Sequence, residues 1–184
     1  GIHGTLQGEG MGLMEDFIIR TRDGSFEIAF SPEAMGRIMR EIFADSSDSL
    51  GEIKETGGIL LGNWETEGET TKIKVYRSSG PGSNSIRQSA LFSPDLSYYS
   101  NRAGYHFSRN GWTYLGEWHR HPGTFHCLSS IDMKMAQELL KDEKWPFLLL
   151  PVLNNENGSA TVTVNIVRMD EKGKPEAISA DRLI

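Results

Sequence analysis

The segment from Trp112 to Ala136 (WTYLGEWHRHPGTFHCLSSIDMKMA) limits the possible folds of this chain more than any other stretch. Its first part, Trp112–His119, is rich in the aromatic side chains that favour strands. Pro122 cannot donate a backbone hydrogen bond, so strand pairing ends there and the chain leaves the sheet. Ser129 or Ser130 then caps a helix, whose apolar positions are Met133, Ala136, Leu139 and Leu140. The chain must therefore hold a sheet and return from one of its strands as a helix.

Two other helices are expected before this segment. Ser31-Pro32-Glu33 supplies an N-cap, a proline at the first helical position and an acidic first turn. The buried face of that helix follows three–four spacing, at Met35, Ile38, Met39, Ile42 and Phe43. Asp45–Ser49 ends it as a polar loop. Ser93-Pro94-Asp95 repeats the same cap chemistry and predicts a helix from about Asp95 to Ser108.

The remaining apolar stretches are predicted to be strands. They are Phe17–Arg20, Phe26–Phe30, Gly57–Trp64, Thr71–Arg77, Phe147–Val152 and Ala160–Met169, beside Trp112–His119. The Gly/Pro/Ser-rich stretch Ser78–Ala90 is predicted to be a long loop that contacts substrate. Asn154–Gly158 is predicted as a turn, and the tail from Asp170 as a loop or an edge. The fold class is α/β (α+β), with a mixed, mostly antiparallel central sheet flanked by about three helices.

Length and charge exclude several classes of protein. The 184 residues suffice for one domain, which we place at residues 15–184, after a flexible tail or cloning remnant at residues 1–14. The net charge of −6 argues against nucleic acid and against anionic membranes as partners, and no apolar run approaches a membrane span. The single cysteine, Cys127, cannot form an internal disulfide, which fits a cytoplasmic location.

Three side chains in the opening segment suit a first-row metal. Because side chains alternate along a strand, His119 and His121 share a face, whereas Arg120 points away from it. Asp132 lies in the first turn of the following helix and can reach back over the loop. Two imidazoles and one carboxylate suit zinc, and three protein ligands leave a fourth position for water, as in catalytic sites.

The same residues, taken with Glu55, resemble the motif of the JAMM (MPN+) zinc metalloproteases. The matching pieces are Glu55 in ETGGILLG, His119-Arg120-His121-Pro122, and Ser129-Ser130-Ile131-Asp132. The resemblance implies a cytidine-deaminase-like JAMM/MPN architecture with one Zn²⁺ ion per chain. It implies that His119, His121 and Asp132 bind the zinc, Glu55 is the general acid/base and Ser129 helps stabilise the oxyanion. It spans roughly Ser31 to Met169, and it departs from the commonest pattern in having Arg120 between the histidines.

Two shorter matches resemble a bacterial branch of this family. Gly80–Asn84 (GPGSN) and Phe92–Asp95 (FSPD) resemble the JAB-type branch associated with ubiquitin-like conjugation operons, including antiphage systems. The resemblance implies an isopeptidase or peptidase that cuts after the C-terminal glycine of a ubiquitin-like β-grasp protein. Alternative readings are a peptidase that processes a sulfur-carrier protein and a scaffold of the same fold without catalysis.

Other readings of single residues stay open. Ser129 can be a helix N-cap as well as an oxyanion donor, and Ser130 competes for the cap. Cys127 beside His126 is a rival nucleophile, an incidental thiol or a further ligand of the metal. Arg87 and Arg102 can meet a substrate carboxylate or lie at the surface. The residues Trp112, Tyr114, Gly116 and Trp118 are expected on the face opposite the histidines, as core.

Overall fold

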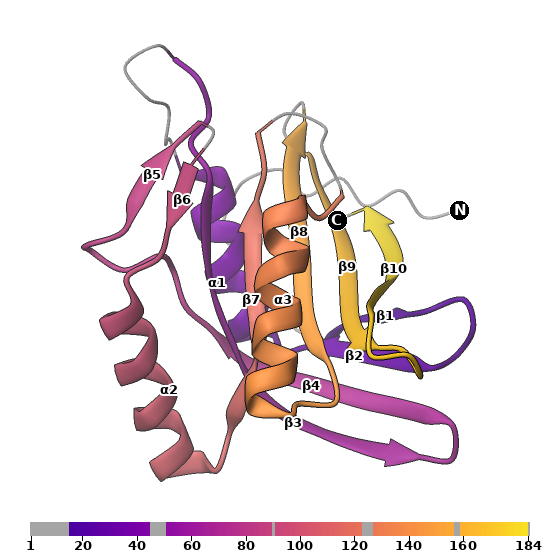
Figure 1. Cartoon of the computed structure of the whole chain (residues 1–184). Helices are drawn as coiled ribbons and strands as arrows, with labels where there is room; N and C mark the ends of the chain where they lie inside the picture. Colours follow the sequence, from indigo (N-terminus) through magenta and orange to yellow (C-terminus); the bar gives the residue numbers. More distant parts are fainter. Residues whose placement is uncertain (1–14, 45–50, 90, 123–126, 157–158, 184) are drawn as a thin grey trace.

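The computed structural model describes residues 15–44, 51–89, 91–122, 127–156 and 159–183. The predicted N-terminal tail, residues 1–14, and the polar loop 45–49 lie outside this described part. The described chain is organised around one large sheet with helices on both faces (Figure 1). None of its described helices combines the length and the apolar character that crossing a membrane requires.

Ten strands lie among the described residues. They are β1 (Phe17–Arg20), β2 (Phe26–Phe30), β3 (Thr56–Glu67), β4 (Thr70–Ser78), β5 (Ile86–Gln88), β6 (Leu91–Ser93), β7 (Thr113–Arg120), β8 (Leu148–Glu156), β9 (Ser159–Met169) and β10 (Pro175–Leu183). Eight of them form a sheet in the order β1-β2-β4-β3-β7-β8-β9-β10, and β5 pairs with β6 separately. In the large sheet β2–β4 and β7–β8 are parallel, and the other neighbours are antiparallel. The expected mixed, mostly antiparallel sheet is confirmed.

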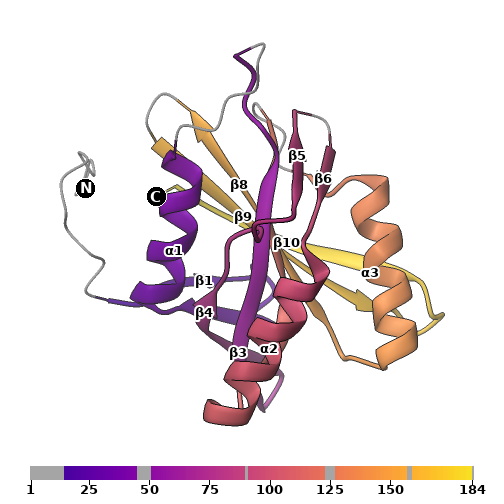
Figure 2. The ribbon, with the colours of Figure 1, turned by 90° about the vertical axis from the view of Figure 1, so that its left-hand side faces the viewer.

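The three described helices cover both faces of the sheet (Figure 2). α1 (Pro32–Phe43) packs on one face, where its Met35, Ile38 and Ile42 share a core cluster with Trp118. α2 (Leu96–Asn110) and α3 (Ser130–Glu143) lie against the other face. Successive residues of a strand face opposite sides, so Leu149 joins the α1 cluster while Leu148 and Leu150 pack with α3.

Helix α1 is confirmed with the predicted cap, because the Ser31 hydroxyl accepts a hydrogen bond from Ala34 N at 3.1 Å. The cap prediction for α2 is wrong. Asp95 is its N-cap, accepting from Tyr98 N at 3.0 Å, and the helix starts at Leu96. A carboxylate two residues after Ser93 provides a stronger acceptor at the helix N-terminus than a hydroxyl does.

Two loop predictions are corrected as well, and one open prediction is decided. The loop 78–90 holds β5, which forms a hairpin with β6. The turn predicted at Asn154–Gly158 is wrong for Asn154, Asn155 and Glu156, which continue β8 and pair with β9; residues 157–158 lie outside the described part. The polar tail forms the edge strand β10, one of its two predicted states. Ladder hydrogen bonds to a neighbouring strand outweigh weak local strand preference in these segments.

A β-bulge in β7 changes which side chains share a face. Leu60 pairs with Gly116 but Leu61 pairs with Tyr114, so Leu115 is the extra residue. Gly116 has φ 147° and lies against the Leu149 backbone, where a Cβ atom has no room. Tyr114 therefore lies on the α3 side, where its ring is 5.2 Å from that of Trp145. The prediction that Tyr114 shares a face with Trp118 is wrong for this reason.

Candidate metal centre

Strand β7 carries the two histidines to one edge of the sheet. His119 pairs with Gly57 of β3 and with Val152 of β8, and His121 follows the last strand residue. Their rings lie nearly parallel, with centroids 6.3 Å apart and an interplanar angle of 20°. Gly57 is required here, because a Cβ atom at this position would lie 2.6 Å from His119 Cδ2. The antiparallel pair β3–β7 thus makes room for the imidazole.

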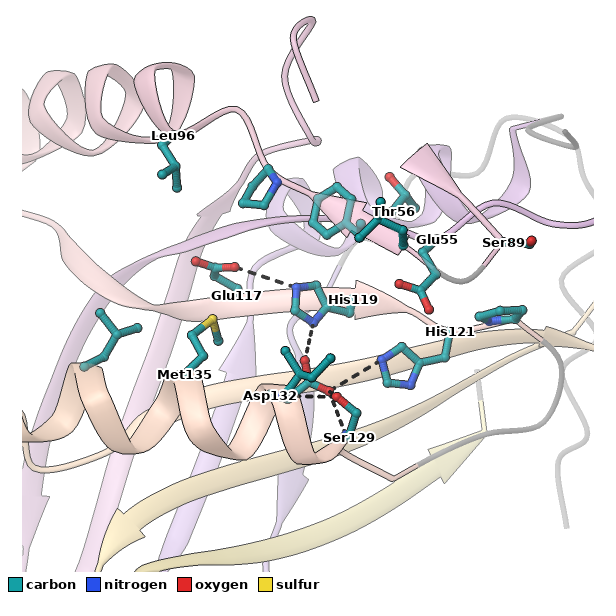
Figure 3. Close-up of a pocket in the computed structure, with 16 residues that line it drawn as sticks. Glu55, Thr56, Ser89, Leu96, Glu117, His119, His121, Ser129, Asp132 and Met135 are labelled. Carbon is teal, nitrogen blue, oxygen red and sulfur yellow. Dashed lines mark hydrogen bonds and ion pairs between the residues drawn. The ribbon is translucent and has the colours of Figure 1, made fainter. Parts of the chain in front are cut away.

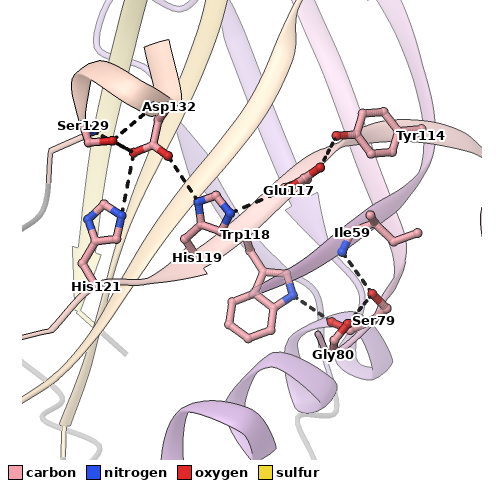
Figure 4. Close-up of polar contacts among 10 residues, drawn as sticks. All are labelled: Ile59, Ser79, Gly80, Tyr114, Glu117, Trp118, His119, His121, Ser129 and Asp132. Atoms are coloured by element: carbon pink, nitrogen blue, oxygen red, sulfur yellow. Dashed lines mark hydrogen bonds and ion pairs between the residues drawn. The ribbon is translucent and has the colours of Figure 1, made fainter. Parts of the chain in front are cut away.

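The start of α3 brings Asp132 to the same place (Figure 4). The Ser129 hydroxyl accepts a hydrogen bond from Asp132 N at 3.1 Å, and Asp132 Oδ2 accepts from Ser129 N at 2.7 Å. This reciprocal capping box fixes the carboxylate relative to the helix. Asp132 Oδ1 then lies 3.7 Å from His119 Nδ1, and Asp132 Oδ2 lies 3.8 Å from His121 Nε2.

These three side chains fit a metal ion. One ligand atom from each of His119, His121 and Asp132 lies within 4.8 Å of the others, and no second such group occurs among the described residues. Zinc bonds of about 2 Å place tetrahedral ligand atoms about 3 to 4 Å apart, which matches the distances to the carboxylate. The three side chains are only 10–13% exposed. The donors, their spacing and their depth all suit a metal site with one position left open.

Glu55 lines the same cavity from the entrance of β3. The cavity has a volume of about 670 Å³, and Figure 3 shows the Glu55 carboxylate pointing toward the two imidazoles. Partial burial raises the pKa of Glu55, while the nearby His119 lowers it and Asp132 raises it. The structure therefore brings all five predicted site residues to one cavity, with Glu55 opposite Asp132 across the histidines. Their individual roles stay predictions.

Hydrogen bonds from neighbouring segments fix the backbone around Glu55. Glu55 N donates to Gln88 O of β5 at 2.8 Å. Arg120 points away from the imidazoles, as its place in the strand predicts, and its Nη2 and Nε donate to Lys54 O at 2.6 and 3.2 Å. Arg120 Nη1 donates to Ile42 O at 3.1 Å, at the end of α1. Burial lowers the pKa of Arg120 to about 10, so the side chain stays charged at neutral pH.

The walls of the cavity are largely apolar away from the metal centre. Helix α3 contributes Ile131, Met135 and Leu139, and the segment from β6 to α2 contributes Leu91, Phe92, Pro94 and Leu96. Ile131 and Leu96 are 78% and 68% exposed and lie at the rim. The predicted substrate-contacting loop is represented here by Ser89 alone, at its end before β6.

Ser129 is engaged in the helix cap, and the remaining candidate residues that the structure describes do not line the cavity. The Ser129 hydroxyl lies 2.7 Å from Asp132 Oδ2, to which it donates, so in this arrangement it serves the cap and the ligand. Cys127 is exposed and does not line the cavity, and His126 lies outside the described residues. Arg87 donates to Glu55 O at 3.4 Å, and Arg102 contacts His106 on α2.

Sequence reasoning missed Glu117, which also lines the cavity. Its side chain is buried beside His119, and strand alternation alone places residues 117, 119 and 121 on one face. Tyr114 contacts Glu117 only because of the bulge, and no local sequence pattern predicts that bulge. The hydrogen bonds from Arg120 to Lys54 O and Ile42 O likewise could be found only from the tertiary structure.

Comparison with known proteins assigns most of the chain to one family. Residues 35–168 match the family described as prokaryotic homologs of the JAB domain. A 70-residue stretch is 34% identical to Probable metalloprotease y4qB of Sinorhizobium fredii, over 37% of this chain and 41% of that protein. The match thus spans about two fifths of that curated relative.

Two solved structures are similar to this chain to different degrees. The solution structure of protein DSY2949 from Desulfitobacterium hafniense matches with a TM-score of 0.51 and 21% identity, over 82% of this chain and 88% of that one. A protein from Salinibacter ruber matches with a TM-score of 0.41 and 16% identity, over 78% and 86% of the two chains. At such identity the first match shows the fold alone. Because the family match runs from α1 to β9, over well more than half of the chain, this protein belongs to the family of prokaryotic homologs of the JAB domain.

Proposed function

We propose that this chain is a zinc-dependent peptidase. The observation that carries the proposal is the meeting of His119, His121 and Asp132 in one cavity with the carboxylate of Glu55 opposite them. Family membership and the similarity to a protein named as a probable metalloprotease support it. A bound zinc ion would polarise the scissile carbonyl and lower the pKa of a water molecule.

Glu55 is the general base in this proposal. Its carboxylate lies at the open side of the three ligands and takes the proton of the attacking water. Partial burial raises the pKa of Glu55 in the metal-free chain, and a carboxylate in such a place can accept a proton from water and return it to the leaving amine. The capping box keeps Asp132 in place through this exchange. The Ser129 O–H rotates from Asp132 Oδ2 toward the cavity and stabilises the oxyanion, while its oxygen still accepts from Asp132 N as the helix cap.

The proposed substrate is the C-terminal tail of a ubiquitin-like β-grasp protein, cut after its last glycine. The family resemblance of the motif and of the segments GPGSN and FSPD supports this choice. The hairpin β5–β6 lies beside Glu55. A glycine tail has no side chains to recognise, so it is bound most simply by adding as a strand to the edge of such a hairpin. The apolar rim at Leu96 and Ile131 suits residues just before the glycines.

The test uses a ubiquitin-like protein whose C-terminal glycine is extended by a short peptide. Mass spectrometry should find cleavage after that glycine, lost on exhaustive chelation and restored by zinc. A chain that binds no metal and cleaves nothing would support the scaffold reading. Activity that survives chelation and disappears in Cys127→Ala would replace the zinc mechanism by a cysteine nucleophile.

A further inference from the structure

Glu117 is a buried acid that the proposed mechanism does not use. It lies on the cavity side of β7, two residues before His119, and is only 8% exposed. A buried carboxylate is costly unless other groups satisfy both of its oxygens. Glu117 Oε1 accepts a hydrogen bond from the Tyr114 hydroxyl at 3.0 Å. Its other oxygen, Oε2, lies 3.7 Å from His119 Nε2.

The two nitrogens of His119 therefore face two different carboxylates (Figure 4). Nδ1 lies 3.7 Å from Asp132 Oδ1, on the side of the metal ligands, and Nε2 faces Glu117. A neutral imidazole carries its proton on one nitrogen and offers the lone pair of the other. Only the tautomer with the proton on Nε2 leaves Nδ1 free to bind a metal. A carboxylate beside Nε2 favours that tautomer.

We propose that Glu117 is a positioning residue, which holds His119 in its metal-binding tautomer and orientation, and that Tyr114 in turn orients Glu117. The Tyr114 hydroxyl occupies one carboxylate oxygen and leaves the other directed at the imidazole. On metal binding the 3.7 Å separation closes to a hydrogen bond from Nε2. The bulge at Leu115 is part of this device, because it turns Tyr114 to the side of Glu117. The inference rests on the proposed metal centre but not on the choice of substrate.

The test measures zinc affinity without any substrate. The metal-free chain competes for zinc with a chromophoric chelator at fixed pH, as wild type and as Glu117→Gln. Glutamine keeps the volume and an oxygen that can accept from Tyr114, but its amide nitrogen cannot accept from the imidazole. Loss of an outer partner of a ligating histidine typically weakens metal binding 10- to 100-fold, and we expect a loss of about that size. Tyr114→Phe should give a smaller loss in the same direction.

The matched control is Trp118→Phe, the next residue on the opposite face of β7. It removes the hydrogen bond from Trp118 Nε1 to Ser79 O, 2.9 Å long, and destabilises the fold without touching His119. Its zinc affinity should equal that of wild type. Cobalt substitution gives a second readout, since the visible spectrum of Glu117→Gln should shift and that of Trp118→Phe should not.

The zinc-affinity measurements distinguish failure of the positioning role from failure of the proposed function. Wild-type zinc affinity in Glu117→Gln, or an equal loss in Trp118→Phe, would overturn the positioning role. If Glu117→Gln did not fold, Tyr114→Phe would carry the test, and unchanged affinity and cobalt spectrum there would overturn the inference. A wild-type chain that bound no zinc would instead overturn the proposed function.

Discussion

The two faces of β7 use their polar groups in different ways. On the α3 side, Glu117 and His119 interact with other side chains: Tyr114, Asp132 and each other. On the α1 side, Trp118 and Arg120 donate to backbone carbonyls, those of Ser79, Lys54 and Ile42 among them. Alternation along one short strand separates the two sets.

The site thus combines a rigid frame on one face of β7 with reactive groups on the other. A backbone carbonyl neither titrates nor changes rotamer, so the α1-side bonds hold β7, α1 and the chain before Glu55 in one arrangement. The carboxylates and imidazoles of the α3 side can exchange protons and ligands within that frame. Changes on the α3 side should therefore alter chemistry with little loss of stability, and changes on the α1 side should cost stability first.

The largest expected effect is on turnover. Glu55→Gln should lower kcat on the order of 10² to 10⁴-fold, because the general base is removed while all three metal ligands remain. Zinc content, measured by atomic absorption, should equal that of wild type. The control is Glu65→Gln, an exposed glutamate at the far end of the same strand, which should leave kcat unchanged. Normal turnover in Glu55→Gln would show that the assigned base is wrong.

Gly57→Ala should damage the metal centre from the neighbouring strand. The new Cβ would lie 2.6 Å from His119 Cδ2 and 2.5 Å from Trp118 O, so His119 must move. We expect loss of zinc binding and a drop in the free energy of unfolding of about 1–3 kcal/mol, measured by urea denaturation.

The matched control for this change is Gly104→Ala in α2, where a Cβ atom meets nothing within 4 Å. This change should stabilise the helix by about 0.5–1 kcal/mol and leave zinc binding unchanged. Zinc binding at wild-type strength in Gly57→Ala would contradict the close packing of β3 against the imidazole.

Arg120→Met should act mainly on stability, as a change on the α1 side. It leaves the carbonyls of Lys54 and Ile42 without their charged donor, and we expect a loss of about 3 kcal/mol in the free energy of unfolding. Because Lys54 precedes Glu55, kcat should fall more than zinc affinity. Arg40→Met, at an exposed position of α1, is the control and should be nearly neutral. Unchanged stability in Arg120→Met would remove the contrast between the two faces.

The smallest expected effect concerns pH. In the metal-free chain, partial burial raises the pKa of Glu55 above the value of about 4.3 for an ordinary glutamate. This raised pKa makes the free energy of unfolding depend on pH. A raised pKa in the folded state means that ionised Glu55 destabilises the fold as pH rises through that pKa. Glu55→Gln should therefore raise the Tm of the metal-free chain at pH 7 and leave it nearly unchanged at pH 4, which thermal unfolding at both pH values checks.

Local patterns in the sequence were enough for most elements. The cap and three–four spacing defined α1, because a helix of this length is decided by neighbours within a turn. The motif spacing identified His119, His121 and Asp132, since a strand end and a helix start with a short loop between them bring their side chains together. Ser129 and Asp132 were likewise found as neighbours of one helix start, where they form the capping box.

The surroundings of these ligands depend on long-range contacts. The β3–β7 register sets Gly57 against His119, and the bulge at Leu115 moves Tyr114 to the side of Glu117. Both depend on pairing between residues far apart in the chain, such as Gly57 with His119 and Leu61 with Tyr114. Such long-range pairing leaves no short-range periodicity in the sequence. The same holds for Arg120, whose carbonyl acceptors lie in segments far from it in the chain. Local sequence therefore defines which residues can hold a metal, whereas long-range pairing defines which side chains face them.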